Sequence, residues 1–387
     1  MDRKRIAILS LSLLTIIYTD TIAPLVQQMC AAFPQISPTL VKMTVTLPAL
    51  MTIFFGLIAG QMVKVISKKA VLAIGLTMYS VGGVAAGYVH NFTIHLVYRG
   101  LVGAGVGLIT PIITSLVADY YQGKERADMI GYNFAVSHFA AVITPALASY
   151  VGTVSWRNAF LIFLVVPLVF VVAMILLPGA SRNNQPGKIK EKAPITTRAM
   201  QCAVIAMLLM VFFFVVVTDL SYLLNTKDVV SPFLATFGLS TFTFGFAIAG
   251  LAFSWIYLKI QRWVIPSGFV VCGAGYFLVT FSQTNALILA GLLSIGLGMG
   301  MLISLLVLQT TNSVGKADST AAAALTNAGF STGIFLSPFF YEKLPSILTG
   351  MERIEFNFFL AGGIFLLAGV ITLTGLIVRR KKLAIQA

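Results

Sequence analysis

The chain has 387 residues, of which 58% are hydrophobic and only 10% are charged, with a mean hydropathy of +0.95. Soluble proteins carry about 25% charged residues, so this composition excludes an ordinary soluble domain and indicates a protein that crosses a membrane several times. The formal net charge of +14 at pH 7 comes from basic residues in short loops between apolar runs, which argues against a nucleic-acid-binding patch.

Twelve apolar runs are long enough to cross a bilayer, which takes about 20 residues in a helix. In the first half we expect spanning helices near 6–26, 41–62, 70–89, 94–118, 128–152 and 157–177. In the second half we expect them near 201–224, 233–257, 264–281, 285–310, 320–341 and 356–378. The first run is too long for a signal peptide and lacks a small-residue cleavage site, so we expect a retained helix.

A polar segment, "GASRNNQPGKIKEKAPITTRA", separates the two sets of runs and contains Pro186 and Pro194. Proline and polar residues of this kind are typical of a linker. We therefore expect an N-terminal six-helix bundle over residues 1–178, a linker over 179–199 and a C-terminal six-helix bundle over 200–387.

The two halves repeat several features in the same order. A Thr-Asp pair lies in the first run of each half, in "YTDTIAPL" at Asp20 and in "VTDLSYLL" at Asp219, 199 positions apart. The glycine motifs "GAGVG" and "GLGMG" are 193 positions apart, as are Pro145 and Pro338. The sequence therefore predicts an all-α integral membrane fold of twelve transmembrane helices in two pseudo-symmetric six-helix bundles.

Lysine and arginine predict the orientation of the chain in the membrane. One set of alternate loops and tails holds twenty of these residues, and the opposite set holds only five. Basic residues concentrate on the cytoplasmic side, so we expect both termini and the linker to be cytoplasmic. We expect a multi-pass protein of the plasma (inner) membrane.

Three local motifs give the chain a recognisable resemblance. In "LVYRGLVGAGVG", Arg99 is followed four residues later by Gly103, "SWRNAFLIF" opens the sixth run, and "GKERADMIG" joins the fourth and fifth runs. With the twelve runs, these motifs resemble the major facilitator superfamily of transporters, in particular its twelve-helix drug:proton antiporter branch. The resemblance implies alternating access between two bundles, with helices 1, 4, 7 and 10 lining a central cavity.

Two motifs depart from the family pattern. In "GQMVKVISKK", Lys64 replaces the usual acid and Ser67 replaces a glycine, which puts the family's ion-pair latch in doubt. In "AAVITPALAS", small residues replace the glycines of the antiporter motif around its proline. The resemblance implies conformational roles for Gly60, Lys68, Lys69, Gly103 and Pro145.

Four ionisable residues fall well inside the apolar runs, namely Asp20, Arg99, His138 and Asp219. Such residues usually face a bundle interior or a wet cavity and mark substrate or proton pathways. At 1.5 Å per residue, Asp20 lies about 21 Å from one membrane face and Arg99 roughly 8 Å from the other, which is nearly the same level. We therefore hypothesise an Asp20–Arg99 pair that couples protons; the alternative is a static salt bridge between two helices.

Asp219 and His138 each have two interpretations. In the second half, the position that corresponds to Arg99 is Leu292, so no arginine is expected beside Asp219. We therefore expect an unpaired carboxylate that binds and releases a proton or binds a cation. The alternative is that its helix ends early, leaving Asp219 wet near Lys227. His138 could relay protons, or it could be a neutral histidine hydrogen-bonded between helices.

Further polar residues are candidates for substrate contacts, with helix packing as the alternative role. The phenylalanines of "VFFFVVV", residues 212–214, could wall an apolar pocket or face lipid. The full set of candidate substrate-binding residues is Tyr18, Asp20, Arg99, Tyr132, Asn133, His138, Asp219, Tyr222, Gln309 and Asn327.

Several classes of function are excluded by what the sequence lacks. It has no phosphate-binding loop for ATP and no cluster of metal ligands or catalytic nucleophile and base, so we expect no enzyme, no metal and no cofactor. We expect a monomeric secondary transporter whose partners are a small-molecule substrate, protons and the lipid bilayer, with no nucleic acid. Proton-coupled efflux of a drug-like compound or metabolite fits best; the alternatives are uptake or exchange of a small organic anion and export of a lipid-like molecule.

Overall fold

The fold is helical throughout the part of the chain that the structure describes. The structure is a computed structural model that describes residues 3–177, 197–226, 232–312, 319–349 and 354–386, and no strand occurs among these residues. The helices form two compact units, Met1–Pro194 and Ile195–Ala387.

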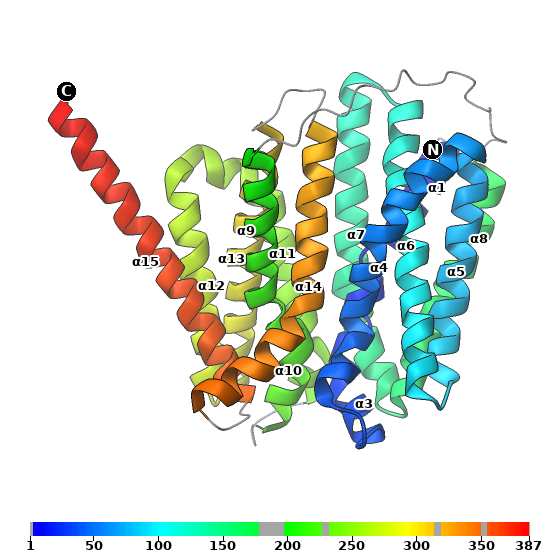
Figure 1. The fold of residues 1–387 in the computed structure, drawn as a ribbon, viewed down its shortest axis with the longest axis horizontal. Coiled ribbons are helices and arrows are strands. Elements are labelled where there is room, and N and C mark those ends of the chain that lie inside the picture. Colours follow the sequence, from blue (N-terminus) through cyan, green and yellow to red (C-terminus); the bar gives the residue numbers. More distant parts are fainter. Residues whose placement is uncertain (1–2, 178–196, 227–231, 313–318, 350–353, 387) are drawn as a thin grey trace. The chain divides into compact units, whose positions relative to one another are not determined.

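The first unit is built around three long helices that lie side by side. The helix α6 packs against both α4 and α5, and α5 also packs against η2 (Figure 1). In chain order its elements are α1 (Arg3–Ser12), α2 (Ile17–Asp20), η1 (Ala23–Leu25), α3 (Val26–Ala32), α4 (Pro38–Val65), α5 (Lys68–Tyr88), α6 (Phe92–Tyr120), α7 (Gly123–Gly152), η2 (Trp156–Leu164) and α8 (Val165–Leu176).

Polar side chains fix where the helices of the first unit begin. Ser37, Ser67, Asn91 and Ser155 precede α4, α5, α6 and η2, and each side chain accepts a hydrogen bond from a backbone N–H in the first turn. The first N–H groups of a helix have no partner within the helix, so a side-chain oxygen at this position stabilises the start.

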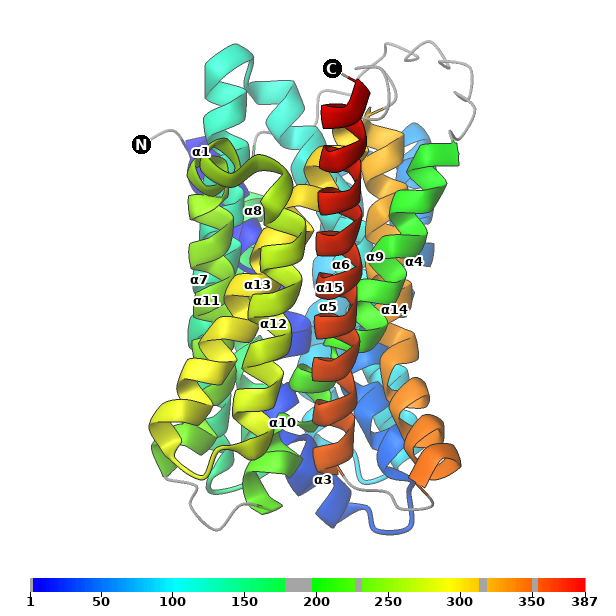
Figure 2. The ribbon, with the colours of Figure 1, turned by 90° about the vertical axis from the view of Figure 1, so that its left-hand side faces the viewer.

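The second unit repeats this arrangement. The helix α13 packs against both α11 and α12, α12 packs against α15, and α9 packs against α14 (Figure 2). Its elements are α9 (Thr197–Phe213), α10 (Val215–Thr226), α11 (Pro232–Ile260), η3 (Gln261–Trp263), α12 (Val264–Phe281), α13 (Asn285–Asn312), α14 (Ser319–Thr349) and α15 (Ile354–Gln386).

The predicted transmembrane architecture is confirmed. Ten stretches of the described residues are long and apolar enough to cross a membrane, and α11 and α14 cover the two other predicted runs, 233–257 and 320–341. Most of the predicted linker, residues 179–196, lies outside the described residues. Its last three residues belong to α9, which begins at Thr197.

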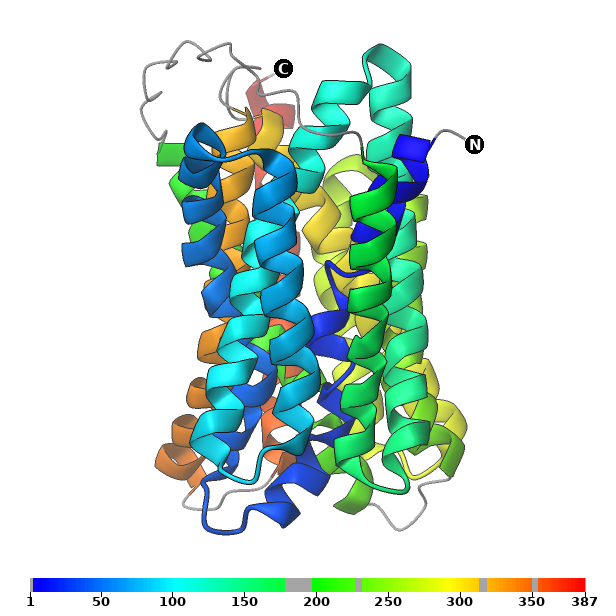
Figure 3. The same ribbon diagram turned by 90° about the vertical axis from the view of Figure 1, so that its right-hand side faces the viewer.

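The first predicted helix of each half is interrupted, which the hydrophobic runs did not predict. In the run 6–26, α1 ends at Ser12, residues 13–16 form turns, and the chain continues as α2 and η1, drawn in dark blue in Figure 3. In the run 201–224, α9 ends at Phe213 and α10 begins at Val215. Each interruption precedes the Thr-Asp pair, so both acids lie on the second part of a broken helix.

Candidate functional site

Asp20 is the last residue of α2 and lies half-buried in the first unit. The Thr19 hydroxyl donates a hydrogen bond to Asp20 Oδ1 over 2.9 Å. The neighbouring threonine of the Thr-Asp pair therefore supports the carboxylate directly.

Arg99 is fully buried and holds three elements of the first unit together. From α6 its Nε donates to the Thr44 carbonyl of α4 over 2.6 Å, and its Nη2 donates to the Tyr18 carbonyl of α2 over 2.6 Å. The guanidinium also lies over the Phe163 ring, 5.7 Å from the centroid. Arg99 therefore fixes α2 against α4 and α6.

The sequence explains why both carbonyls are open to an arginine. Pro48 lies four residues after Thr44 in α4 and has no N–H to close that turn of the helix. Near Tyr18, the backbone N–H of Ile22 bonds to Thr19 instead, so the Tyr18 carbonyl has no donor from the next turn. Two local irregularities thus create the acceptors for Arg99.

The predicted Asp20–Arg99 ion pair is wrong for this structure. Among the described residues, no ion pair joins the two side chains, and Arg99 Nη1 has no hydrogen-bond partner. Arg99 donates to the backbone carbonyls of Tyr18 and Thr44, whereas Asp20 accepts from the Thr19 hydroxyl. The two side chains therefore have different hydrogen-bond partners.

His95 belongs to the same polar cluster and was not predicted. It is fully buried one helical turn before Arg99, its Nδ1 lies 2.7 Å from the Ala86 carbonyl, and its Nε2 lies 3.2 Å from the Thr44 hydroxyl. A carbonyl only accepts, so Nδ1 carries the proton and Nε2 accepts from the threonine. The spacing of four residues between His95 and Arg99, which places them on one helix face, was the available signal.

Polar residues of α7 pack against the broken first helix. The Ser12 hydroxyl donates to Asn133 Oδ1 over 2.7 Å, and the Ser137 hydroxyl donates to the Ser12 carbonyl over 2.7 Å. Asn133, a candidate substrate residue, thus makes an interhelical contact. The neighbouring candidate His138 is half-buried in α7.

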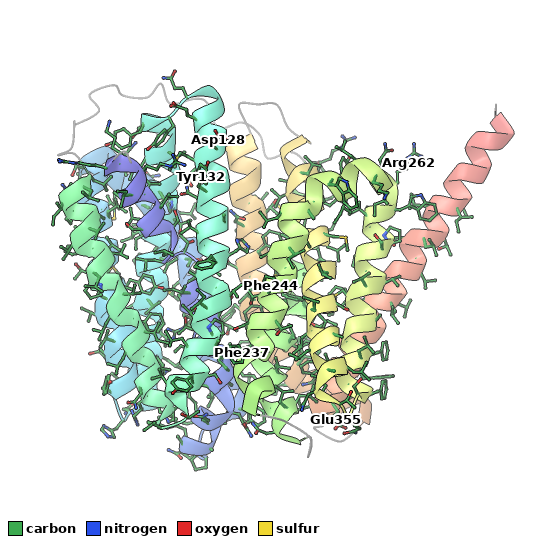
Figure 4. All side chains as sticks on the ribbon, turned by 180° about the vertical axis from the view of Figure 1, so that it is seen from behind. Asp128, Tyr132, Phe237, Phe244, Arg262 and Glu355 are labelled. Carbon is green, nitrogen blue, oxygen red and sulfur yellow. The ribbon has the colours of Figure 1, made fainter. Side chains whose placement is uncertain are left out.

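Tyr132 lies toward the N-terminal end of α7 (Figure 4). It is 45% exposed, and the Arg5 guanidinium lies over its ring, 4.4 Å from the centroid. The structure therefore does not bring Tyr132 into the cluster of Arg99, His95 and Thr44.

Asp219 is fully buried in α10, and Asn357 Nδ2 of α15 donates to its Oδ2 over 3.2 Å. The carboxylate thus has a neutral amide as a hydrogen-bond partner. The alternative that its helix ends early is wrong, because α10 continues to Thr226. Leu292, at the position where Arg99 would repeat, is also fully buried.

The other candidates of the second unit lie around these helices. Tyr222 is half-buried in α10, while Gln309 of α13 and Asn327 of α14 are exposed. The neighbours of the last two, Thr310 and Thr326, lie 3.2 Å apart between their hydroxyl oxygens. The threonines thus form the contact between α13 and α14, and the two candidates next to them, Gln309 and Asn327, are exposed.

The phenylalanines of residues 212–214 pack inside the second unit. Phe213 and Phe214 are buried, Phe212 lies 5.2 Å from Phe340 and Phe213 lies 5.4 Å from Phe242 between ring centroids. The figure with side chains shows Phe237 and Phe244 on the neighbouring α11 (Figure 4). This aromatic stretch therefore stabilises the break between α9 and α10.

The candidate conformational residues fall into two groups. Lys68 forms an ion pair with Asp119 at the end of α6, and Lys69 Nζ donates to the Leu177 carbonyl over 2.9 Å. Asp119 thus supplies an acid although Lys64 occupies the usual acidic position. Gly103 packs against the backbone of Pro48, whereas a side chain at Gly60 would meet open space. Pro145 lies within α7.

The geometry can be compared with known proteins. A family model described as the Major Facilitator Superfamily matches residues 8–338 of the chain. The chain belongs to this superfamily.

Two relatives in this superfamily are named for drugs. The Multidrug transporter protein MdtP of Bacillus subtilis is 28% identical over 133 residues, which are 34% of this chain and 24% of the relative. The Quinolone resistance protein NorA of Staphylococcus aureus is 24% identical over 140 residues, 36% of each chain. The match thus spans about a quarter of one relative and about a third of the other, in agreement with the predicted drug-transporter branch.

A solved structure supports the fold over its full length. The nucleoside transporter NupG superposes with a TM-score of 0.78 at 12% identity, covering 96% of this chain and 99% of that chain. At this identity the likeness concerns the fold, and it agrees with the major facilitator architecture predicted from the sequence.

Proposed function

We propose that the chain is a secondary transporter that works by alternating access and exports small drug-like or metabolite molecules in exchange for protons. The observation that carries the proposal is the matched position of two carboxylates. Asp20 and Asp219 each lie on the second part of an interrupted helix, the first of its unit. A carboxylate inside a membrane protein is costly, and such residues commonly mark proton or ion pathways.

The two carboxylates have surroundings suited to gaining and losing a proton. Asp20 has a hydroxyl neighbour in Thr19, and Asp219 has an amide neighbour in Asn357. Hydroxyl and amide groups can both donate and accept, so each can support the ionised or the protonated acid. In this proposal Arg99 does not exchange protons with Asp20; it holds α2 in place through the Tyr18 carbonyl.

The direction and the location in the cell are part of the proposal. The drug-related relatives favour export, and the excess of basic residues in one set of loops favours a multi-pass plasma (inner) membrane protein with both termini in the cytoplasm. We propose a monomer that moves its substrate without chemical change.

Uptake or exchange of a small organic anion is the second candidate, and one observation favours it. Arg99 Nη1 is buried and has no hydrogen-bond partner in the part of the chain that the structure describes. A guanidinium N–H in this position could bind a carboxylate or phosphate oxygen. An anion that competes with export substrates, with loss of competition in Arg99→Lys, would favour this candidate.

Substrate-induced proton movement in proteoliposomes tests the main proposal. A pH-sensitive dye reports the proton flux when lipophilic cations, neutral drugs or organic anions are added to wild type, Asp20→Asn and Asp219→Asn. Glu355→Gln is the matched control, because Glu355 is an exposed carboxylate at the start of α15 (Figure 4). Folding of each variant is checked by its unfolding temperature.

The expected result is a substrate-dependent flux in wild type and Glu355→Gln that is lost in at least one of the other two variants. Equal flux in all four proteins would contradict a coupling role for Asp20 and Asp219. Counterflow of a substrate without any proton flux would identify a facilitator or exchanger instead.

A further inference from the structure

The two interrupted helices share a second feature that their sequences alone do not reveal. Backbone carbonyls at each interruption accept hydrogen bonds from side-chain hydroxyls of other helices. In an apolar environment a backbone carbonyl without a partner is costly, so an interrupted helix needs such donors.

In the first unit the donors come from α5 and α7. The hydroxyl of Tyr79, a fully buried residue of α5, donates to the Leu14 carbonyl over 3.2 Å. The hydroxyl of Ser137 in α7 donates to the Ser12 carbonyl over 2.7 Å. Leu14 lies six residues before Asp20.

In the second unit the donors come from α12 and α14. The hydroxyl of Tyr276, a fully buried residue of α12, donates to the Phe213 carbonyl over 2.6 Å. The hydroxyl of Tyr341 in α14 donates to the Phe212 carbonyl over 2.7 Å. Phe213 lies six residues before Asp219.

The correspondence between the units extends to the helices involved. Tyr79 and Tyr276 come from the third long spanning helix of each unit, and Ser137 and Tyr341 come from the fifth. The carbonyls that accept from Tyr79 and Tyr276 belong to Leu14 and Phe213, and each lies six residues before the aspartate of its unit. Packing alone requires a buried aromatic ring but not a hydroxyl directed at the same point of each repeat.

Tyr276 contacts its interruption at the last residue of α9. Its hydroxyl donates to the Phe213 carbonyl over 2.6 Å. The backbone N–H of Val217 bonds to Phe214, which leaves the Phe213 carbonyl for the tyrosine. The phenol hydroxyl thus takes the place of the helix N–H that the Phe213 carbonyl lacks.

We propose that Tyr79 and Tyr276, assisted by Ser137 and Tyr341, are positioning residues that hold the interruptions of the acid-bearing helices and so fix the direction of Asp20 and Asp219. The part of this inference that concerns coupling rests on the proposed function. At each interruption the continuous helix that would fix the direction of α2 or α10 relative to the preceding helix is absent. The hydroxyl bond restricts that turn, and the acid six residues later moves with it.

Tyr→Phe variants test the inference because they remove one hydroxyl and keep the ring. Amide hydrogen exchange of full-length protein in nanodiscs is compared for wild type, Tyr79→Phe and Tyr276→Phe. We expect about fivefold faster exchange over residues 13–20 in the first variant, and over residues 214–219 in the second. Tyr150→Phe is the matched control, since Tyr150 is 71% exposed.

Modification by a hydrophobic carbodiimide reads out each acid without any transport. The reagent attacks buried carboxylic acids, and mass spectrometry gives the pH at which labelling of Asp20 or Asp219 is half-maximal. We expect Tyr79→Phe to move this pH by about half a unit or more for Asp20 only, and Tyr276→Phe to do so for Asp219 only. A general loss of structure would change the labelling of both aspartates in the same variant.

Unchanged exchange at the two interruptions would overturn the role of the hydroxyls. Faster exchange without a shift in the labelling of either acid would overturn the positioning of the carboxylates. Absence of substrate-dependent proton flux in wild type would end the proposed function, while the exchange and labelling results would still decide the inference about the tyrosines.

Discussion

The Thr44 carbonyl accepts the Nε–H of Arg99 over 2.6 Å, at the turn of α4 where Pro48 offers no N–H. The arginine of the "YRGLVGAG" motif therefore has a structural role, which is to donate to a backbone carbonyl and not to pair with an acid. The same guanidinium reaches the Tyr18 carbonyl, so it connects the interrupted first helix to α4. Arg99 therefore acts here as a donor to backbone carbonyls.

Arg99→Lys should destabilise the protein strongly, because one ammonium group cannot serve the two separated carbonyls of Thr44 and Tyr18. We expect a loss of about 2–3 kcal/mol in the free energy of unfolding, measured by denaturant titration in detergent. Arg157→Lys is the control. Both bonds of Arg157, to the Gly87 and Val89 carbonyls, come from its single atom Nη1, which a lysine can replace. Equal losses in the two variants would contradict this account.

Gly103→Ala should be far more damaging than Gly60→Ala. A Cβ atom at Gly103 would collide with the Pro48 backbone, whereas a Cβ at Gly60 meets nothing within 4 Å. We expect Gly103→Ala to cost about 1–3 kcal/mol, and Gly60→Ala to be neutral or stabilising by up to about 1 kcal/mol. The unfolding temperature in detergent measures both. If the two variants melted alike, α6 would not depend on this close approach to α4.

His95→Phe should destabilise the first unit although it keeps an aromatic ring. The change leaves the Thr44 hydroxyl and the Ala86 carbonyl without the histidine nitrogens that contact them. We expect a cost of about 1–3 kcal/mol. His90→Phe, at an exposed position, is the comparison and should change the unfolding temperature little. A His95→Phe protein as stable as wild type would show that packing alone decides this position.

The Asp219–Asn357 contact can be measured by a double-mutant cycle. Asn357→Leu and Asp219→Leu each remove one partner of the 3.2 Å hydrogen bond, and the double variant removes both. We expect a coupling free energy of about 1 kcal/mol or more, with the double variant less destabilised than the sum of the single variants. Additive losses would show that the amide and the carboxylate do not support each other.

The transmembrane spans could be predicted because long apolar runs leave few alternatives. Several parts of the site could not. The interruption at residues 13–16, "LLTI", contains no glycine or proline, and its donors Tyr79 and Ser137 are distant in sequence. The local signal is weak: the hydroxyls of Ser12 and Thr15 bond to the Ile8 and Ser12 carbonyls, as such side chains also do within continuous helices.

The partner of Arg99 was also beyond a charge-based prediction. Counting residues along the helices predicted that Asp20 and Arg99 lie at the same depth in the membrane. This count does not tell toward which neighbouring helix each side chain points. The sequence shows Pro48, which leaves the Thr44 carbonyl without its helix donor. That Arg99 of α6 is the donor instead could be seen only once the two helices were placed side by side. Asn357 lies 138 positions from Asp219, and no periodic pattern links the two.

Gradient-driven transport tests the central claim, proton coupling through Asp20 and Asp219, most directly. Proteoliposomes containing wild type or the Asp20→Asn/Asp219→Asn double variant are given an imposed pH gradient, and accumulation of a fluorescent lipophilic cation is recorded beside its counterflow without a gradient. The account predicts that the double variant keeps counterflow and loses accumulation. Accumulation at the wild-type level in the folded double variant would contradict it.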